Sequence, residues 1–209
     1  RWMQVEVTFA DVPAGPLQVR MSRSSPGRYA LHEFAKNVFD VRAENAAGTP
    51  IALEQPNLHQ WNARGHGGTV RLRYRLFGNR VDGTYVGVDA DHAHLNIPAT
   101  LMWARTLEER PARVTLVPPP DVSWRVATQL FSTADPFVFT APNLAYLLDS
   151  PIQFSPHTLK TFTVPNRGGR PATIRIALHH AGTEAQADAF TKDVEAIVRE
   201  QQAIFGELP

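Results

Sequence analysis

Histidine and acidic side chains occur at two places in the sequence where their spacing could suit a metal ion. The first is His32-Glu33-Phe34-Ala35-Lys36, which begins like the His-Glu-x-x-His helix of zinc peptidases. In that motif two imidazoles four residues apart hold zinc and the glutamate activates water. Lys36 stands where the second histidine should be, and an ammonium group cannot ligate a metal. We therefore expect no metal here, and we expect His32 and Glu33 to lie on a turn with Phe34 as a buried anchor.

The second place is Asp89-Ala90-Asp91-His92-Ala93-His94. His92 and His94 could share one face of a strand and bind a metal together with Asp89 or Asp91. A metal site needs a sufficient set of ligands at defined spacings, and a third ligand of that kind is missing. Structural hydrogen bonding is therefore favoured over metal binding for this segment.

Patterns for nucleophilic catalysis and nucleotide binding are weak or missing. The sequence has no Gly-x-Ser-x-Gly element, and Ser25, Ser150 and Ser155 each precede a proline, where turn formation explains them. The glycine-rich stretch 65–68 precedes a predicted strand rather than a helix, so we interpret it as a hairpin turn and not as a phosphate loop. The sequence has no cysteine, which excludes disulfides and thiolate chemistry.

A row of arginines alternates with apolar residues between positions 69 and 77. Arg71, Arg73 and Arg75 would share one face of a strand, which is typical of the solvated side of an antiparallel sheet. No aromatic residue interleaves with them, as a nucleic-acid platform would require, and the formal net charge is only +1. We therefore predict no nucleic-acid partner. No apolar run approaches the roughly 20 residues that cross a bilayer, so we also predict no membrane span.

The elements that must position these residues are mostly strands. Hydrophobic residues make up 43% of the 209 residues and charged residues 20%, as in a globular protein. Its 17 prolines and 13 glycines separate short segments in which apolar residues alternate with polar ones. The stretch 85–103 is predicted to be a long irregular loop with one helical turn near 99–103. Strands are predicted at 2–9, 17–21, 38–43, 51–53, 69–77, 113–117, 137–140, 159–164 and 173–178.

Only the end of the chain has helical periodicity. Thr183 can cap a helix with Gln186 as its capping-box partner, and Gly206 is a natural stop. We therefore predict a mostly β fold, a β-sandwich or curved antiparallel sheet with a carboxy-terminal α-helix. The predicted division is a β-rich domain at residues 1–182, followed at residues 183–209 by the helix and a linker that ends in 205–209. The apolar residues at helical spacing are Phe190, Val194, Ile197, Val198 and Phe205.

Three stretches carry a resemblance to a known family. The first is the Pro-Gly-x-Tyr turn at 26–29 with the acidic-Phe-Ala step at 33–35. The second is Gln60-Trp61 followed by the arginine-rich strand and His92-Ala93-His94-Leu95-Asn96. The third is the stretch 141–151, which ends in Asp-Ser-Pro. Together they resemble, in order and spacing, the amino-terminal domain of the glycyl aminopeptidase-type zinc metallopeptidases, peptidase family sixty-one. The matching motif residues include Pro26, Gly27, Tyr29, Phe34, Trp61 and Pro151.

The resemblance implies a three-part protein, in which a β-rich domain packs on a zinc catalytic domain and a PDZ-like domain often follows. On this hypothesis this chain has no catalytic, metal or cofactor site and is not itself an enzyme. Zinc and the hydrolase activity of the parent metallo-aminopeptidase would reside in the absent catalytic domain. The partners would be that domain and the peptide substrate. We expect a location in the periplasm or cell envelope rather than the cytoplasm.

The resemblance also implies which residues face the substrate. The β domain would close one end of the cleft and help select short peptides with a free amino terminus. The candidates are Tyr146, Asp149, Ser150 and Gln153. The family usually has a glutamate where this sequence has Gln153, so Asp149 is the best remaining carboxylate. The alternative for Asp149 and Ser150 is that they cap a turn before the proline.

Two other functions are compatible with the residues. A stand-alone β-sandwich module that binds carbohydrate or protein would align its tryptophans on one exposed surface. The candidates for that surface are Trp2, Trp61, Trp103 and Trp124. An independent hydrolase would use His92, His94 and nearby aspartates.

Overall fold

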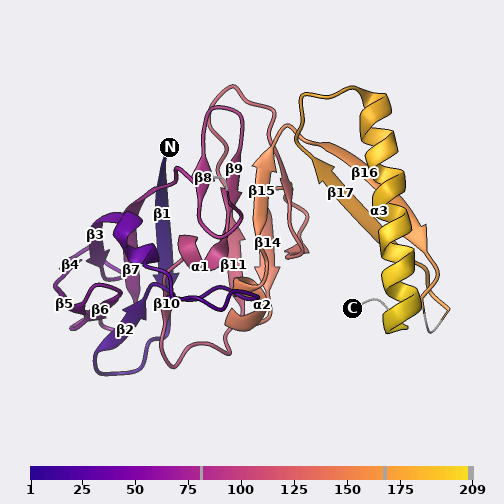
Figure 1. Cartoon of the computed structure of the whole chain (residues 1–209). Helices are drawn as coiled ribbons and strands as arrows, with labels where there is room; N and C mark the ends of the chain where they lie inside the picture. The colour runs from indigo at the N-terminus through magenta and orange to yellow at the C-terminus, as the bar shows by residue number, and fades with distance from the viewer. Residues whose placement is uncertain (81, 167–168, 207–209) are drawn as a thin grey trace. The chain divides into compact units, whose positions relative to one another are not determined.

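The computed structural model describes residues 1–80, 82–166 and 169–206, so part of the predicted link, Glu207–Pro209, lies outside the described residues. Contacts divide the chain into two compact units, residues 1–154 and residues 155–209. Figure 1 shows short strands throughout the first unit and, in the second, a pair of strands with one long helix. The prediction of a mostly β fold with antiparallel sheets and a carboxy-terminal helix is confirmed.

Two four-stranded sheets make up the first part of unit 1. Their strand orders are β1-β7-β3-β4 and β10-β2-β6-β5. All of their pairings are antiparallel. The strands of the first sheet are β1 (Trp2–Phe9), β3 (Val38–Glu44), β4 (Pro50–Ile51) and β7 (Val70–Phe77), and those of the second are β2 (Leu17–Arg20), β5 (Leu53–Asn57), β6 (Gln60–Ala63) and β10 (Trp103–Ala104).

One face of strand β7 packs in the core and the other faces solvent, as its alternating sequence predicts. Its apolar side chains are buried, and the hydroxyl of Tyr74 donates to the carbonyl of Thr100 at 2.8 Å and accepts from the N–H of Met102 at 3.1 Å. Burial raises the pKa of Tyr74 well above its ordinary value, although the bond from Met102 acts in the opposite direction. The phenol therefore stays protonated in the folded core.

The outer face of β7 carries the arginine row, and each arginine has an acidic partner on a neighbouring strand. Because every charge in the row is paired, the row is the solvated face of a sheet and offers no unbalanced positive charge to an anionic ligand. The nearest contacts are Arg71 to Glu44 at 2.7 Å, Arg73 to Glu6 at 2.7 Å and Arg75 to Asp40 at 2.6 Å.

Two further sheets complete unit 1, with strand orders β12-β15-β9-β8 and β11-β14-β13. Their strands are β8 (Gly87–Val88), β9 (Ala93–Leu95), β12 (Arg125–Ala127), β15 (Ile152–Ser155), β11 (Ala112–Thr115), β13 (Phe131–Ser132) and β14 (Val138–Ala141). The helical segments of the unit are η1 (Phe34–Asn37), α1 (Ile97–Thr100) and α2 (Leu144–Leu148).

The prediction that 85–103 is an irregular loop is wrong in part. The stretch contains β8, β9 and the start of β10, and its helical turn begins at Ile97 rather than at Ala99. Strands of two or three residues are too short to show an alternating pattern. They form because β9 pairs with β15, which lies more than 50 residues further along the chain.

The glycine-rich stretch 65–68 is also not a hairpin turn, because β6 and β7 belong to different sheets. His66 fixes this connection. Its Nδ1 accepts from the N–H of Gly68 at 3.0 Å, so the neutral ring carries its proton on Nε2 and donates to the carbonyl of Gly15 at 2.9 Å. The stretch therefore carries the chain from one sheet to the other.

Unit 2 consists of the antiparallel pair β16 (Thr158–Val164) and β17 (Ala172–Leu178) with helix α3 (Glu184–Phe205). The predicted capping box is confirmed, since Thr183 and Gln186 satisfy each other's backbone N–H groups. Lys160 on β16 forms ion pairs with Glu184 and Asp188 on the helix. No helix in the described part of the chain combines the length and the apolarity needed to cross a bilayer.

Candidate functional site

The segment from Tyr146 to Gln153, predicted to face substrate, begins in helix α2 and ends in strand β15. The helix follows Asn143, whose side-chain oxygen accepts a hydrogen bond from the N–H of Tyr146 at 2.9 Å. This bond satisfies an N–H that the first turn of a helix leaves unpaired. After Leu148 the chain turns through the Asp-Ser-Pro motif into β15. Local capping thus determines where helix α2 begins.

Gln129 braces this turn from a distant part of the chain. Its side-chain amide donates to the carbonyl of Asp149 at 2.6 Å and to Oγ of Ser150 at 3.2 Å. The backbone carbonyl of Gln129 accepts a hydrogen bond from the hydroxyl of Tyr146 at 2.8 Å. Ser150 is fully buried, and its Oγ donates to the carbonyl of Tyr146 at 2.6 Å. The hydroxyl of Ser150 is therefore engaged in holding the turn, as the capping alternative proposes.

Asp149 differs from Ser150 because its side chain is exposed. Among the described residues only its backbone is hydrogen-bonded, and no hydrogen bond or ion pair involves its carboxylate. On the same turn the ring of Tyr146 stacks on that of Phe131 with centroids 5.1 Å apart, and Phe131 stays half exposed. A carboxylate without a described partner on a hydrogen-bonded turn can contact an ammonium group, and an exposed aromatic pair can contact an apolar side chain.

Gln153 lies directly opposite His94 in the antiparallel pair β15–β9. The residues next to each of them, such as Leu95 and Phe154, are buried in the core, so Gln153 and His94 share the other face of the sheet. Nε2 of His94 is buried and has no hydrogen-bond partner in the part of the chain that the structure describes.

Strand β9 also connects this pair to the Pro-Gly turn. Nδ2 of Asn96, directly after β9, donates to Oγ of Ser25 at 3.2 Å. Ser25 opens a turn that the N–H of Arg28 closes on its carbonyl at 3.0 Å. Pro26 and Gly27 occupy the two central positions, and Gly27 has the positive φ, 71°, that the second of them requires in a type II turn. Strand β9 therefore pairs with the strand that follows the Asp-Ser-Pro motif, and Asn96 directly after it contacts the Pro-Gly turn.

The remaining motif residues divide into buried anchors and exposed side chains. Phe34 and Trp61 lie in the core, whereas Tyr29 protrudes into solvent together with Leu31. Pro151 is exposed at the entry to β15. Two exposed apolar side chains beside a hydrogen-bonded turn are typical of a contact surface.

The histidine pair is not arranged as metal ligands. Nδ1 of His92 lies 3.0 Å from Oδ2 of Asp89, whose Oδ1 accepts from the N–H groups of Asp91 and His92 at 2.8 Å. Burial acts to raise the pKa of Asp89, but these bonds outweigh it, so the pKa lies below its ordinary value. In the described ranges no three histidine, aspartate or glutamate side chains come together as a metal site would require.

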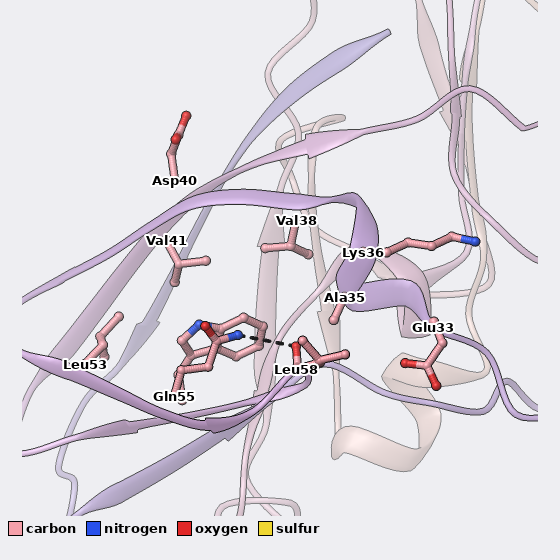
Figure 2. A pocket seen from close by; sticks show the side chains of 10 residues that line it. Glu33, Ala35, Lys36, Val38, Asp40, Val41, Leu53, Gln55 and Leu58 are labelled. Carbon is pink, nitrogen blue, oxygen red and sulfur yellow. Dashed lines mark hydrogen bonds between the residues drawn. The ribbon is translucent and has the colours of Figure 1, made fainter.

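A groove in unit 1 opens between strands β3 and β5, with a volume of about 620 Å³. Figure 2 shows Val38, Val41, Leu53 and Leu58 around the hollow, and the buried Trp61 also lines it. None of the residues from Tyr146 to Gln153 lines this groove.

The charged residues at the groove are already paired with other parts of the chain. Glu33 contacts Arg23 at 2.7 Å, and Asp40 contacts Arg75 at 2.6 Å. Lys36 points away from the hollow in Figure 2, and its Nζ lies over the ring of Tyr85, 5.4 Å from the centroid. The groove is therefore an apolar opening between strands of two sheets, and each charged residue that lines it already has a partner elsewhere in the chain.

The tryptophans do not form the exposed platform that a carbohydrate-binding module would need. Trp61 and Trp124 are buried and Trp103 is half-buried, so among the four only Trp2 is exposed. Trp2 packs against Phe39 and Phe77 and beneath the guanidinium of Arg75. No observation on the tryptophans thus favours the carbohydrate alternative.

Three contributors to the site were missed by reasoning from the sequence. Gln129 and Phe131 lie in a stretch with no periodic pattern, and their contacts with the turn arise from tertiary packing. His94 belongs to a segment for which the sequence favours structural hydrogen bonding over metal binding, but its register against Gln153 is invisible in local sequence. Resemblance had marked the stretches that meet here, but not their contacts.

Fold and site together define a β-rich class of domain in which Gln129 and Ser150 brace an Asp-Ser-Pro turn. The family model described as the Peptidase M61 N-terminal domain matches residues 1–156. The match covers most of the chain, so this chain belongs to the M61 peptidase family through its amino-terminal domain. A search of curated proteins finds no match.

A solved structure has the same fold. It is the crystal structure of an aminopeptidase N family protein from Idiomarina loihiensis, which superposes with a TM-score of 0.85 over 100% of this chain at 20% sequence identity. This chain spans 35% of the length of that protein. The likeness at this identity establishes the fold.

Proposed function

We propose that this chain is the non-catalytic amino-terminal part of a zinc aminopeptidase, in which it packs on the catalytic domain and forms one wall of the substrate cleft. The turn from Tyr146 to Gln153 is the part of the wall that faces the substrate. The observation that carries the proposal is Asp149, an exposed carboxylate without a partner among the described residues, on a turn that Gln129 and Ser150 hold in place.

An exopeptidase has to recognise the free ammonium group at the end of its substrate. A carboxylate held on a rigid turn suits that task, because it accepts charge-assisted hydrogen bonds without first having to be ordered. The stacked rings of Tyr146 and Phe131 then offer an apolar surface to the side chain of the terminal residue.

Gln153 modifies this picture. Its amide oxygen is a neutral acceptor, which binds an ammonium group more weakly than a carboxylate does. Asp149 therefore dominates the recognition of charge, while Gln153 hydrogen-bonds to polar groups of substrate or of the catalytic domain.

Zinc and the hydrolytic step are assigned to the catalytic domain. The residues described in this chain do not fit the metal, since no group of three ligands forms among them. In the whole protein a bound zinc would polarise the scissile carbonyl and activate water. This chain would contribute only binding and positioning.

Two measurements test the proposal. The chain of residues 1–209 is assayed for hydrolysis of aminoacyl substrates and for bound zinc, and the same assays are then made on the protein that includes the catalytic domain. We expect activity and one zinc per molecule only in the second case, with free amino termini preferred over acetylated ones. Zinc-dependent cleavage by residues 1–209 alone would overturn the proposal.

A further inference from the structure

Helix α3 has a packing side and an unpartnered apolar side. On its packing side Ala187 is buried, and Val194 and Val198 are half-buried. Lys160 on β16, ion-paired with the first turns of the helix, belongs to the same interface. This side accounts for the attachment of α3 to its strands within unit 2 (Figure 1).

The unpartnered side carries Phe190, Ile197 and Ile204, which are 50%, 55% and 76% exposed. They recur at a spacing close to two helical turns, so they form one stripe along the helix. A repeated stripe of large apolar residues is too extended to be a scatter of single exposed side chains, and it indicates a contact surface. We refer to these three residues as the α3 stripe.

Unit 2 follows the amino-terminal domain in sequence, and its two-stranded sheet has open edges. The family match ends at residue 156, and the compact unit begins at residue 155. In the described residues, β16 and β17 pair only with each other, so both outer edges of the pair are open. A two-stranded sheet with one helix is marginal by itself and gains stability when its open surfaces are covered.

We propose that residues 155–209 form the first layer of the peptidase domain, and that the α3 stripe is buried against the remainder of that domain. This rests on the proposed function, which requires a peptidase domain in the same protein. The fold of this whole chain, α3 included, recurs in the solved aminopeptidase N family protein, where it covers 35% of that protein's chain.

Charge at the border of the stripe argues for this partner over a second copy of the chain. Asp193 and Glu200 lie next to the stripe, and no ion pair involves either of them in the part of the chain that the structure describes. A symmetric dimer through the stripe would bring the same acidic border together from both copies, which is unfavourable. The matching surface is therefore apolar with basic side chains at its rim.

Single cysteines test which side of α3 becomes covered, because the chain has none of its own. Ile197→Cys places a thiol in the stripe. Lys192→Cys places one on a different, exposed side of the helix and is the matched control. Both residues are exposed, so neither substitution should disturb folding. The rate of reaction of each thiol with a maleimide is measured for residues 1–209 alone and for the protein that includes the peptidase domain, with the modified position identified by peptide mass spectrometry.

We expect both thiols to react quickly in the isolated chain, and the peptidase domain to slow Ile197→Cys at least tenfold while Lys192→Cys changes less than twofold. If Ile197→Cys is as reactive in that protein as in residues 1–209 while the protein hydrolyses its substrates and binds zinc, the docking inference is wrong and the proposed function stands. If residues 1–209 alone hydrolyse the substrates, the proposed function fails and the inference fails with it. Protection of Ile197→Cys that rises with the concentration of the isolated chain would instead identify a second copy as the partner and overturn the inference.

Discussion

His94 on β9 lies directly opposite Gln153 on β15, and its buried Nε2 has no hydrogen-bond partner among the described residues. The two side chains come from stretches far apart in the sequence, and antiparallel register places them on one face of the sheet. The resembling family usually has a glutamate at the position of Gln153. In this chain, a glutamate at position 153 would stand opposite the imidazole of His94.

The first prediction concerns this pair. In the protein that includes the peptidase domain, Gln153→Glu should lower KM for peptides with a free amino terminus by about tenfold, because a charge-assisted hydrogen bond contributes roughly 1.5–3 kcal/mol. Steady-state kinetics on free and amino-acetylated peptides measure the effect.

The acetylated peptide is the internal control, since it has no ammonium group and its KM should not fall. Gln153→Leu, of similar size but without hydrogen-bonding groups, separates charge from shape. An equal fall of KM for both peptides would show that position 153 does not contact the amino terminus.

The second prediction concerns Asp149. Asp149→Asn removes the charge and keeps the shape, so KM for free amino termini should rise about threefold to tenfold, the effect of one partly exposed charge pair. The thermal midpoint of unit 1 should stay unchanged, because the carboxylate makes no described contact. Its backbone bond to Gln129 survives the substitution. A drop in thermal midpoint without a change in KM would assign Asp149 a structural role.

The third prediction tests the brace of the turn. Ser150→Ala removes the bond to the carbonyl of Tyr146 and leaves that oxygen and the amide of Gln129 short of partners, so the free energy of unfolding should fall by about 1–3 kcal/mol. Urea unfolding followed by tryptophan fluorescence measures it. The 4 tryptophans of the chain all lie in unit 1, so the signal reports on that unit alone.

The control for this experiment is Ser123→Ala, at an exposed serine. It should change the free energy of unfolding by less than about 0.5 kcal/mol. If Ser150→Ala is equally silent, the turn is not held by this hydroxyl, and the rigidity attributed to the wall loses its basis.

How far the sequence predicts the fold depends on the length of each element. Strand β7 and helix α3 were predicted well because eight alternating residues and 22 helical residues leave little ambiguity about period. Strands β8 and β9 contain two and three residues, and no local pattern of that length distinguishes a strand from a loop. The start of α3 is encoded locally by Thr183 and Gln186. In contrast, the division into compact units depends on which strands pair, and pairing is a tertiary property.

The same contrast applies to the site. Resemblance located the Asp-Ser-Pro turn, and turn chemistry suggested that Ser150 supports it. The brace from Gln129, the stacked ring of Phe131 and the register of His94 depend on contacts between residues far apart in the chain, which no motif in a single sequence encodes. Motifs therefore locate the segments of the site, whereas strand register and packing determine the contacts between them.

The last prediction concerns Tyr74 and alkaline pH. The folded state holds the phenol protonated, with its pKa well above the ordinary value of about 10. The unfolded chain loses this proton above pH 10 and the folded chain does not, so the unfolded state binds fewer protons there. The stabilising contribution is complete below pH 10 and is lost as pH rises toward the folded pKa. The free energy of unfolding of unit 1 should therefore fall with pH above 10.

Tyr74→Phe isolates this contribution. At pH 7 the variant should be less stable by about 1–3 kcal/mol, because the carbonyl of Thr100 and the N–H of Met102 lose a buried partner. Between pH 10 and 11 its stability should fall less steeply than that of the unsubstituted chain, and urea midpoints over that range measure both slopes. Tyr29→Phe is the matched control, since its exposed ring makes the phenol accessible in both states. Parallel slopes for all three proteins would show that Tyr74 ionises as easily in the folded core as in the unfolded chain.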